Sequence, residues 1–163
     1  MAVHIHPLDI PQKYYKPLGQ IAAGWNLTEA LISSIIWHVH KIKEPERGRL
    51  FTYRPTAAQK LGIFGVTIDR FVTDPTLKTE LKALCGRASG LKKMRNMLVH
   101  GLWGRMPNQP KTWKVFYHSE MQDMILLKRK EMTVDQVKRI AGQVRTLNFD
   151  LKKLMARIGA PPP

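Results

Sequence analysis

The segment Leu91–Gly104 reads as the end of an apolar helix that three polar residues interrupt. They are Arg95, Asn96 and His100, and Gly101 follows them as the expected helix stop. Histidine changes its protonation state near neutral pH, so it can accept or donate a proton during a reaction. Arginine offers fixed positive charge in a forked geometry that suits a phosphate oxyanion. Cleavage of an RNA phosphodiester through its 2′-hydroxyl uses both of these groups.

Such a reaction leaves a 2′,3′-cyclic phosphate and a 5′-hydroxyl, and it requires no metal ion. DNA would resist it, because the nucleophile is missing. On a helix, Asn96 and His100 are four residues apart and share a face, so the amide can orient the imidazole. Arg95 lies five residues before His100, about 140° round the helix. We therefore expect the two to flank one groove without stacking on each other.

A second charged residue stands in an apolar line of another helix. Glu29 follows Trp25 at helical spacing, and Arg95 lies on the apolar seam of its own helix. A charge that faces a core must be paired, because its desolvation alone costs several kcal/mol. We therefore expect Glu29 to pair with Arg95 and to position the guanidinium. In the alternative, the pair only sets helix register and His100 is a helix C-terminal residue that favours the dipole.

The elements that would position these residues are mainly helices. Apolar residues alternate at steps of three and four from Pro17, over 55–71, from Asp74-Pro75 to Gly101, and after the capping box at Thr133. Two short strands, within 112–130, precede the last helix, whereas 41–49 and 104–110 read as loops. The pattern predicts a mainly α, up-and-down four-helix bundle with a small β-hairpin before the last helix. Residues 1–16 read as an extended arm, 17–158 as one bundle domain and 159–163 as a proline-rich tail.

The charge of the chain favours a polyanionic partner. Lysine and arginine number 27 against 12 acidic residues, and the net charge is +15. Phosphate contacts carry much of the non-specific affinity for nucleic acids, so RNA is the expected partner. The residues expected to contact its backbone are Lys92, Lys93, Arg105, Lys138, Arg145 and Lys152. Three of these repeat every seven residues along the last helix, although such a line is also typical of a solvated helix face.

Other features narrow the class of protein. No segment approaches the roughly 20 apolar residues that cross a bilayer, and the first residues lack the pattern of a signal peptide. A single cysteine, Cys85, cannot form an internal disulfide, which suits a reducing cytoplasm. The sequence contains no glycine-rich phosphate loop, no nucleophile elbow and no ligand cluster for a metal ion. We therefore expect no cofactor and no metal.

The stretch RNMLVHG, with Arg95, Asn96 and His100, resembles the Arg-x4–6-His signature of HEPN domains (higher eukaryotes and prokaryotes nucleotide-binding). The common form of that signature has asparagine after the arginine. A first helix with Trp25 and Glu29 adds to the likeness, which covers 17–158 in architecture and seven residues in the motif.

The resemblance implies a helical bundle that forms a homodimer with the two motifs facing each other. It implies a metal-independent endoribonuclease of toxin–antitoxin, phage-defence or RNA-processing systems, with an antitoxin or regulatory protein as a further partner. Arg95 and His100 then carry over as catalytic and Asn96 as a supporting residue. Some members keep the motif while serving as binding domains. Two alternatives therefore stay open: a non-catalytic nucleic-acid-binding or regulatory dimer, and a bundle whose role is assembly.

Overall fold

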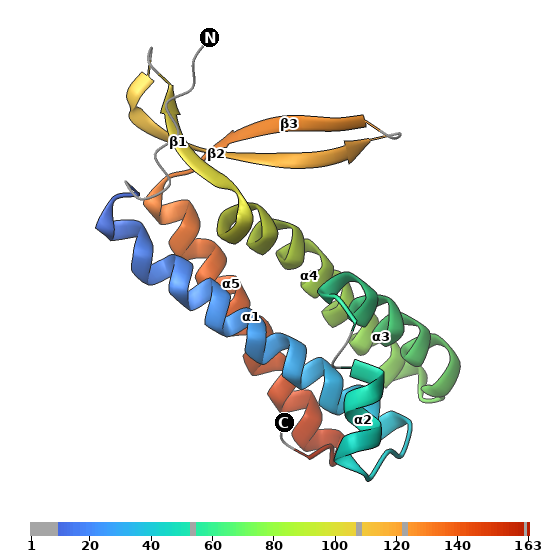
Figure 1. The fold of residues 1–163 in the computed structure, drawn as a ribbon. Coiled ribbons are helices and arrows are strands. Elements are labelled where there is room, and N and C mark those ends of the chain that lie inside the picture. Colours follow the sequence, from blue (N-terminus) through green and yellow to red (C-terminus); the bar gives the residue numbers. More distant parts are fainter. Residues whose placement is uncertain (1–9, 53–54, 107–108, 122–123, 162) are drawn as a thin grey trace. The chain divides into compact units, whose positions relative to one another are not determined.

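The computed structural model describes residues 10–52, 55–106, 109–121, 124–161 and 163. Within them the chain is mainly helical, with one three-stranded antiparallel sheet of order β1-β2-β3 (Figure 1). The helices are α1 (Gln12–Val39), α2 (Pro45–Thr52), α3 (Ala57–Phe71), α4 (Pro75–His100) and α5 (Val134–Ile158); the strands are β1 (Leu102–Met106), β2 (Gln109–Met121) and β3 (Met124–Glu131). The predicted mainly α fold with strands before the last helix is confirmed.

Local signals account for where several helices begin. Asp74 accepts a hydrogen bond from the backbone amide of Leu77, so it caps α4 as expected. The predicted capping box at the start of α5 is also present, with Thr133 and Gln136 bonded to each other's backbone at 3.2 and 2.8 Å. Helix α1 begins earlier than predicted, at Gln12, so the expected arm is shortened. Residues 1–9 of that arm lie outside the described residues.

Two elements overlap the segments predicted to be loops, 41–49 and 104–110. Helix α2 begins inside the first segment and extends to Thr52, and it depends on tertiary contacts of Trp37. The indole nitrogen donates to the Thr52 hydroxyl at 3.0 Å, and a Cβ at Gly48 would overlap the indole ring. Strand β1 begins before the second segment and ends inside it. It pairs with β2, with Trp103 opposite Val115, so the predicted hairpin is part of a three-stranded sheet.

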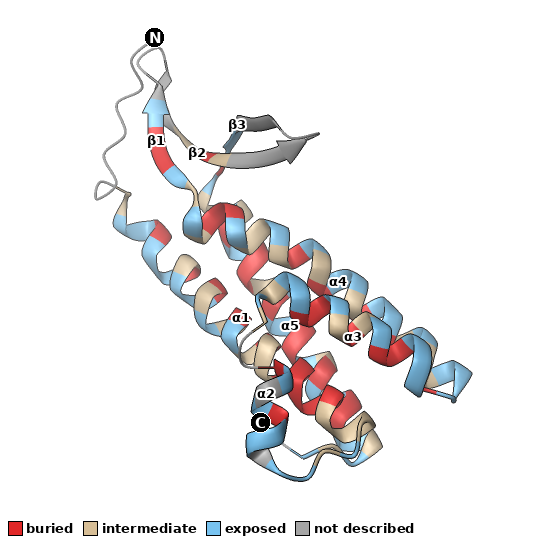
Figure 2. Cartoon of the chain, turned by 45° about the vertical axis from the view of Figure 1, so that its right-hand side comes forward, coloured by how far each residue is buried: buried red, intermediate tan, exposed pale blue. Residues whose placement is uncertain are grey.

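The chain divides into two compact units, each described by itself. The sheet unit comprises residues 1–22 and 93–142, and the helical unit comprises 23–92 and 143–163. Helices α1, α4 and α5 therefore contribute residues to both. Figure 2 shows buried residues along these helices and on α3. None of the helices in the described part of the chain is long and apolar enough to cross a membrane.

The helical unit is held by polar contacts between its helices as well as by its apolar core. Asn148 of α5 donates to the Gly24 carbonyl at 2.8 Å and contacts the Thr28 hydroxyl at 2.7 Å, both on α1. Successive contacts along the chain show that α1, α3 and α5 run in one direction in this unit and that α4 runs in the other. The segment with α2 therefore returns the chain between α1 and α3, so the predicted up-and-down order holds from α3 to α5 but not between α1 and α3. Large core side chains are Trp25, Ile32, Ile36, Phe64, Ile68, Leu81, Leu147 and Leu151.

The core of the sheet unit joins the start of α1 to the sheet and to the end of α4. The Tyr14 and Trp103 rings lie 5.2 Å apart, and both side chains are buried. Trp103 donates to the Leu98 carbonyl at 2.9 Å, and the Tyr14 hydroxyl donates to the Met132 carbonyl at 2.9 Å. Burial raises the pKa of that tyrosine hydroxyl. These contacts fix the strands directly beside the last turn of α4.

Candidate active site

The motif occupies the last two turns of α4, inside the sheet unit. The amide of Gly101, the residue after α4, makes the last helical hydrogen bond, to the Met97 carbonyl at 3.0 Å, and the chain then passes into β1. A Cβ at position 101 would overlap the Met97 carbonyl oxygen and the Val115 side chain. Only glycine allows the end of α4 to approach β2 this closely. The packing of the sheet therefore determines where His100 projects.

Arg95 contacts both of the other motif residues. Its Nη1 atom donates to Asn96 Oδ1 at 3.0 Å and lies 2.6 Å from His100 Nε2. A guanidinium has donors only, so Nε2 is the acceptor, and the ring is neutral with its proton on Nδ1 in this arrangement. Asn96 and His100 therefore both bond to the same nitrogen of Arg95, and we call these three residues the triad.

This geometry corrects one expectation and adds a contact that helical spacing did not predict. Arg95 and His100 were expected to flank a groove without stacking on each other, and Asn96 was expected to orient the imidazole. Instead Arg95 bonds to the ring and Asn96 bonds to Arg95. Helical periodicity describes the directions of the Cβ atoms, whereas a long arginine side chain can cover the remaining angle. The orienting group for His100 is the arginine itself.

The charge of Arg95 is not compensated within the described part of the chain. Its hydrogen-bond partners are neutral, and it forms no ion pair with a described carboxylate. The Arg95 Nε atom is buried and has no hydrogen-bond partner, which is costly for a charged group. Asn96 and His100 are exposed. The Arg95 guanidinium, with one N–H donor that has no partner, therefore lies beside a solvent-accessible imidazole. This arrangement is suited to binding an anion.

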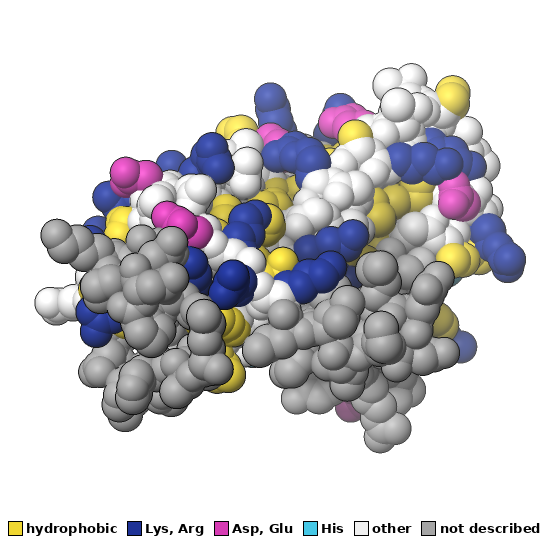
Figure 3. All heavy atoms as spheres, turned by 90° about the horizontal axis from the view of Figure 1, so that it is seen from above, with side chains coloured by type: hydrophobic (Ala, Val, Ile, Leu, Met, Phe, Trp, Pro, Cys, Tyr) yellow, Lys and Arg dark blue, Asp and Glu magenta, His cyan; other side chains and the backbone are white. Residues whose placement is uncertain are grey.

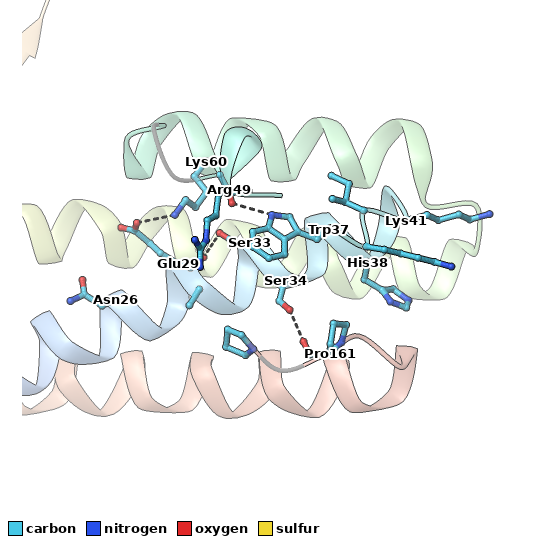
Figure 4. Close-up of a pocket in the computed structure, with 15 residues that line it drawn as sticks. Asn26, Glu29, Ser33, Ser34, Trp37, His38, Lys41, Arg49, Lys60 and Pro161 are labelled. Atoms are coloured by element: carbon cyan, nitrogen blue, oxygen red, sulfur yellow. Dashed lines mark hydrogen bonds and ion pairs between the residues drawn. The ribbon is translucent and has the colours of Figure 1, made fainter. Parts of the chain in front are cut away.

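Glu29 has a different partner from the one predicted. It lies on α1 in the helical unit, where Trp25 Nε1 donates to Oε1 at 2.5 Å. Lys60 Nζ lies 3.3 Å from Oε2 (Figure 4). The expected pairing with Arg95 is thus replaced by a pairing with Lys60. Lys60 lies on the buried face of α3 with Leu61 and Phe64, where its long aliphatic stem lets the lysine be only 8% exposed. We assign the Glu29 carboxylate to Lys60 and not to the motif.

The cations expected to contact RNA fall into both units. Lys93, Arg105 and Lys138 belong to the sheet unit, with the motif, whereas Lys92, Arg145 and Lys152 belong to the helical unit. All are exposed except Lys92, which is half-buried. Arg105 lies 5.1 Å from the centre of the Trp113 ring, and Lys138 pairs with Asp135 at 3.7 Å. Half of the predicted set therefore shares a compact unit with the motif.

The sheet adds cations that the sequence analysis did not single out. Lys128, Arg129 and Lys130 are exposed on β3, and the strand register places Lys130 opposite Val115 and Lys128 opposite Tyr117. These two lysines thus share a face of the sheet with Val115 and Tyr117. The run LLKRK at 126–130 is the sequence pattern that could have predicted these cations. Figure 3 shows lysine and arginine side chains spread over the face in view, with fewer acidic ones among them.

A pocket of about 370 Å³ lies near the motif in the sheet unit. It is apolar and is lined by residues on both sides of His100, including Val99, Gly101 and Trp103, but not by the three motif side chains. Among the described residues, no three His, Cys, Asp or Glu side chains gather in a way that could hold a metal ion. The candidate site is therefore the exposed triad itself.

No protein-family model, curated protein or solved structure matches this chain. The functional inference accordingly depends on the geometry of the triad and on the charge around it.

Proposed function

We propose that this protein is an endoribonuclease that cleaves RNA through its 2′-hydroxyl without using a metal ion. The observation that supports this most directly is the uncompensated Arg95 guanidinium, 2.6 Å from the exposed His100 ring at the end of α4. A fixed cation and a proton-transfer group within one hydrogen bond of each other are the two groups that this chemistry uses.

In the proposed reaction, His100 Nε2 takes the proton from the ribose 2′-hydroxyl. The 2′-oxygen attacks the adjacent phosphorus, the bond from phosphorus to the 5′-oxygen breaks, and the leaving oxygen receives a proton from the imidazolium. The products are a 2′,3′-cyclic phosphate and a 5′-hydroxyl. Each proton that the ring accepts is returned, so the enzyme ends as it began.

Arg95 would move from the imidazole to the phosphate when RNA binds. This exchange frees the Nε2 lone pair for the proton and places the positive charge where the phosphorane gathers negative charge. An anion that draws the guanidinium outward also gives Arg95 Nε the hydrogen bond that it lacks. Asn96 holds Nη1 from one side and acts as a positioning residue.

The net charge of +15 supports RNA as the substrate. We infer that Lys93, Arg105 and Lys138 contact the backbone near the cut, because they share a unit with the motif. For Lys92, Arg145 and Lys152, contact with RNA stays a prediction from the sequence. The resemblance to HEPN domains adds a homodimer with facing motifs, a role in toxin–antitoxin or phage-defence systems, and an antitoxin or regulatory partner. The single cysteine supports a cytoplasmic location in this proposal.

The test is incubation of the purified protein with total RNA in the presence of EDTA. We expect cleavage that falls at least about 100-fold in His100→Ala, the range for loss of an acid–base group. His38→Ala, which removes a histidine of the helical unit, should cleave like the wild type. A substrate with a single 2′-deoxyribose at the cleaved position should resist. Equal degradation by the wild type and His100→Ala would reveal a contaminant and defeat the proposal.

A second candidate is a nucleic-acid-binding protein without catalysis. It is favoured by the contact of Arg95 with His100 Nε2, which occupies the lone pair that a general base needs. In that case the wild type and His100→Ala should bind RNA equally, with an affinity that falls steeply with salt. Neither protein would then generate a cyclic phosphate.

A further inference from the structure

A pocket in the described part of the helical unit is lined by none of the three motif residues. It has a volume of about 960 Å³ and lies between α1, the segment with α2, the start of α3, and residues 161 and 163 (Figure 4). One face of α1 forms its long wall. The α1 and following residues lining it recur at steps of three and four: Asn26, Glu29, Ala30, Ser33, Ser34, Trp37, His38 and Lys41. The fourteen helical residues from Asn26 to Val39 correspond to a length of roughly 21 Å.

Hydrogen bonds hold the walls of this pocket in place. Trp37 is tied to Thr52 at 3.0 Å, which keeps the short helix α2 against α1. Ser34 donates to the Pro161 carbonyl at 2.5 Å, which keeps the chain after α5 at the opposite wall. Ala30, Ile42 and the proline rings add apolar surface. The pocket is therefore formed before any ligand binds, as most small-molecule sites are.

The charges lining the pocket are unbalanced. Glu29 is the only acid among the lining residues, and Lys60 and Trp25 already bond to its carboxylate. Three further lining cations, Lys41, Lys43 and Arg49, form no ion pair or side-chain hydrogen bond within the described residues. In Figure 4, Arg49 reaches toward Ser33 and Glu29, while Lys41 lies at the other end of the pocket.

We propose that this pocket binds an elongated amphipathic organic anion, of the kind formed by a medium-length alkyl chain with a carboxylate or phosphate head. The apolar body lies along α1 past Ala30 and Trp37. The acidic head is held by Arg49 or by Lys41 and Lys43, the cations that lack a partner. An apolar body alone would leave the three charges uncompensated, and a small inorganic anion would leave the apolar walls uncovered.

The probe is anilinonaphthalene sulfonate, an aromatic anion whose fluorescence rises in apolar surroundings, and phenylnaphthylamine is its uncharged counterpart. We expect Lys43→Glu/Arg49→Glu to weaken the sulfonate about tenfold, the scale of two partly exposed charge contacts reversed. Binding of the uncharged probe should change little. The matched control is Arg70→Glu/Lys153→Glu, which makes the same substitutions at exposed positions of the same unit outside the pocket.

Competition then identifies the ligand class. Decanoate or decyl phosphate should displace the sulfonate from the wild type, the stronger competitor revealing the preferred head group, whereas decanol should not. Ala30→Trp, which fills the pocket, should weaken both probes. Equal weakening by the control pair, or displacement by decanol as effective as by the anions, would overturn the proposal. If Ala30→Trp does not fold, the charge-reversed pair and the competition still decide the question.

Discussion

Within the described residues, the two charges predicted to lie on apolar seams, Glu29 and Arg95, belong to clusters that differ in how the charge is balanced. In the helical unit, Glu29 and Lys60 form an ion pair whose side chains are 27% and 10% exposed. In the sheet unit, Arg95 meets Asn96 and His100, which are neutral and exposed. The first cluster compensates its charges internally, whereas the second leaves one positive charge available.

On this difference we base the proposal of a structural role for the first cluster and a chemical role for the second. A compensated, largely buried pair contributes to the fold, and its loss leaves a lone charge in a poor environment. An uncompensated cation with a buried donor without a partner contributes little to folding and gains when an anion arrives. Both residues were predicted from the same signal, a charge on an apolar seam. The partners, and not the seam, distinguish the two roles.

The largest effect on stability should come from a glycine that positions the sheet-unit cluster. Gly101→Ala should lower the free energy of unfolding by about 3 kcal/mol, because the added methyl overlaps the Met97 carbonyl oxygen and Val115. Gly86→Ala, on the same helix but in the helical unit, should raise it by about 0.5–1 kcal/mol, since a Cβ there meets open space. Chemical denaturation measures both. Stabilisation by both substitutions would show that α4 does not end against β2.

A smaller effect should separate the two clusters directly. Lys60→Met should lower the free energy of unfolding by about 2 kcal/mol, less than for a fully buried pair because Glu29 is partly exposed. Adding Glu29→Gln to the Lys60→Met variant should restore part of the lost stability, because it removes the charge left without its partner. Arg95→Met should change stability by less than about 1 kcal/mol but should abolish RNA cleavage. If Arg95→Met unfolds the protein and Lys60→Met leaves the free energy of unfolding unchanged, the assignment of the two roles is wrong.

We expect the smallest loss of stability from substitutions at two matched helix caps. Thr56 caps α3 in the helical unit and Thr133 caps α5 in the sheet unit, each with a glutamine three residues later. Replacing either threonine by alanine should cost about 1 kcal/mol. Because α1, α4 and α5 contribute to both units, we expect one thermal transition that either substitution lowers equally. Two transitions, each lowered by one substitution, would show that the units unfold separately.

Much of the fold was predictable because its signals are local. The apolar spacing of α1, α3, α4 and α5 indicated each helix, and Asp74 and Thr133 indicated two of their starts. Helix α2 and strand β1 were missed for a shared reason. Each is short, and each depends on the contacts of one tryptophan. Helix α2 depends on Trp37, which lies outside it on α1, and strand β1 depends on Trp103 in its own centre.

The order of residues alone was enough to place Arg95, Asn96 and His100 together at a helix end, since helical spacing and a following glycine are properties of a few neighbouring residues. Which charges meet was decided by tertiary packing. Glu29 pairs with Lys60 because α3 brings that lysine beside α1, 31 residues away along the chain. Long side chains also reach past the directions that periodicity assigns, so the Arg95–His100 bond became visible only in the folded chain.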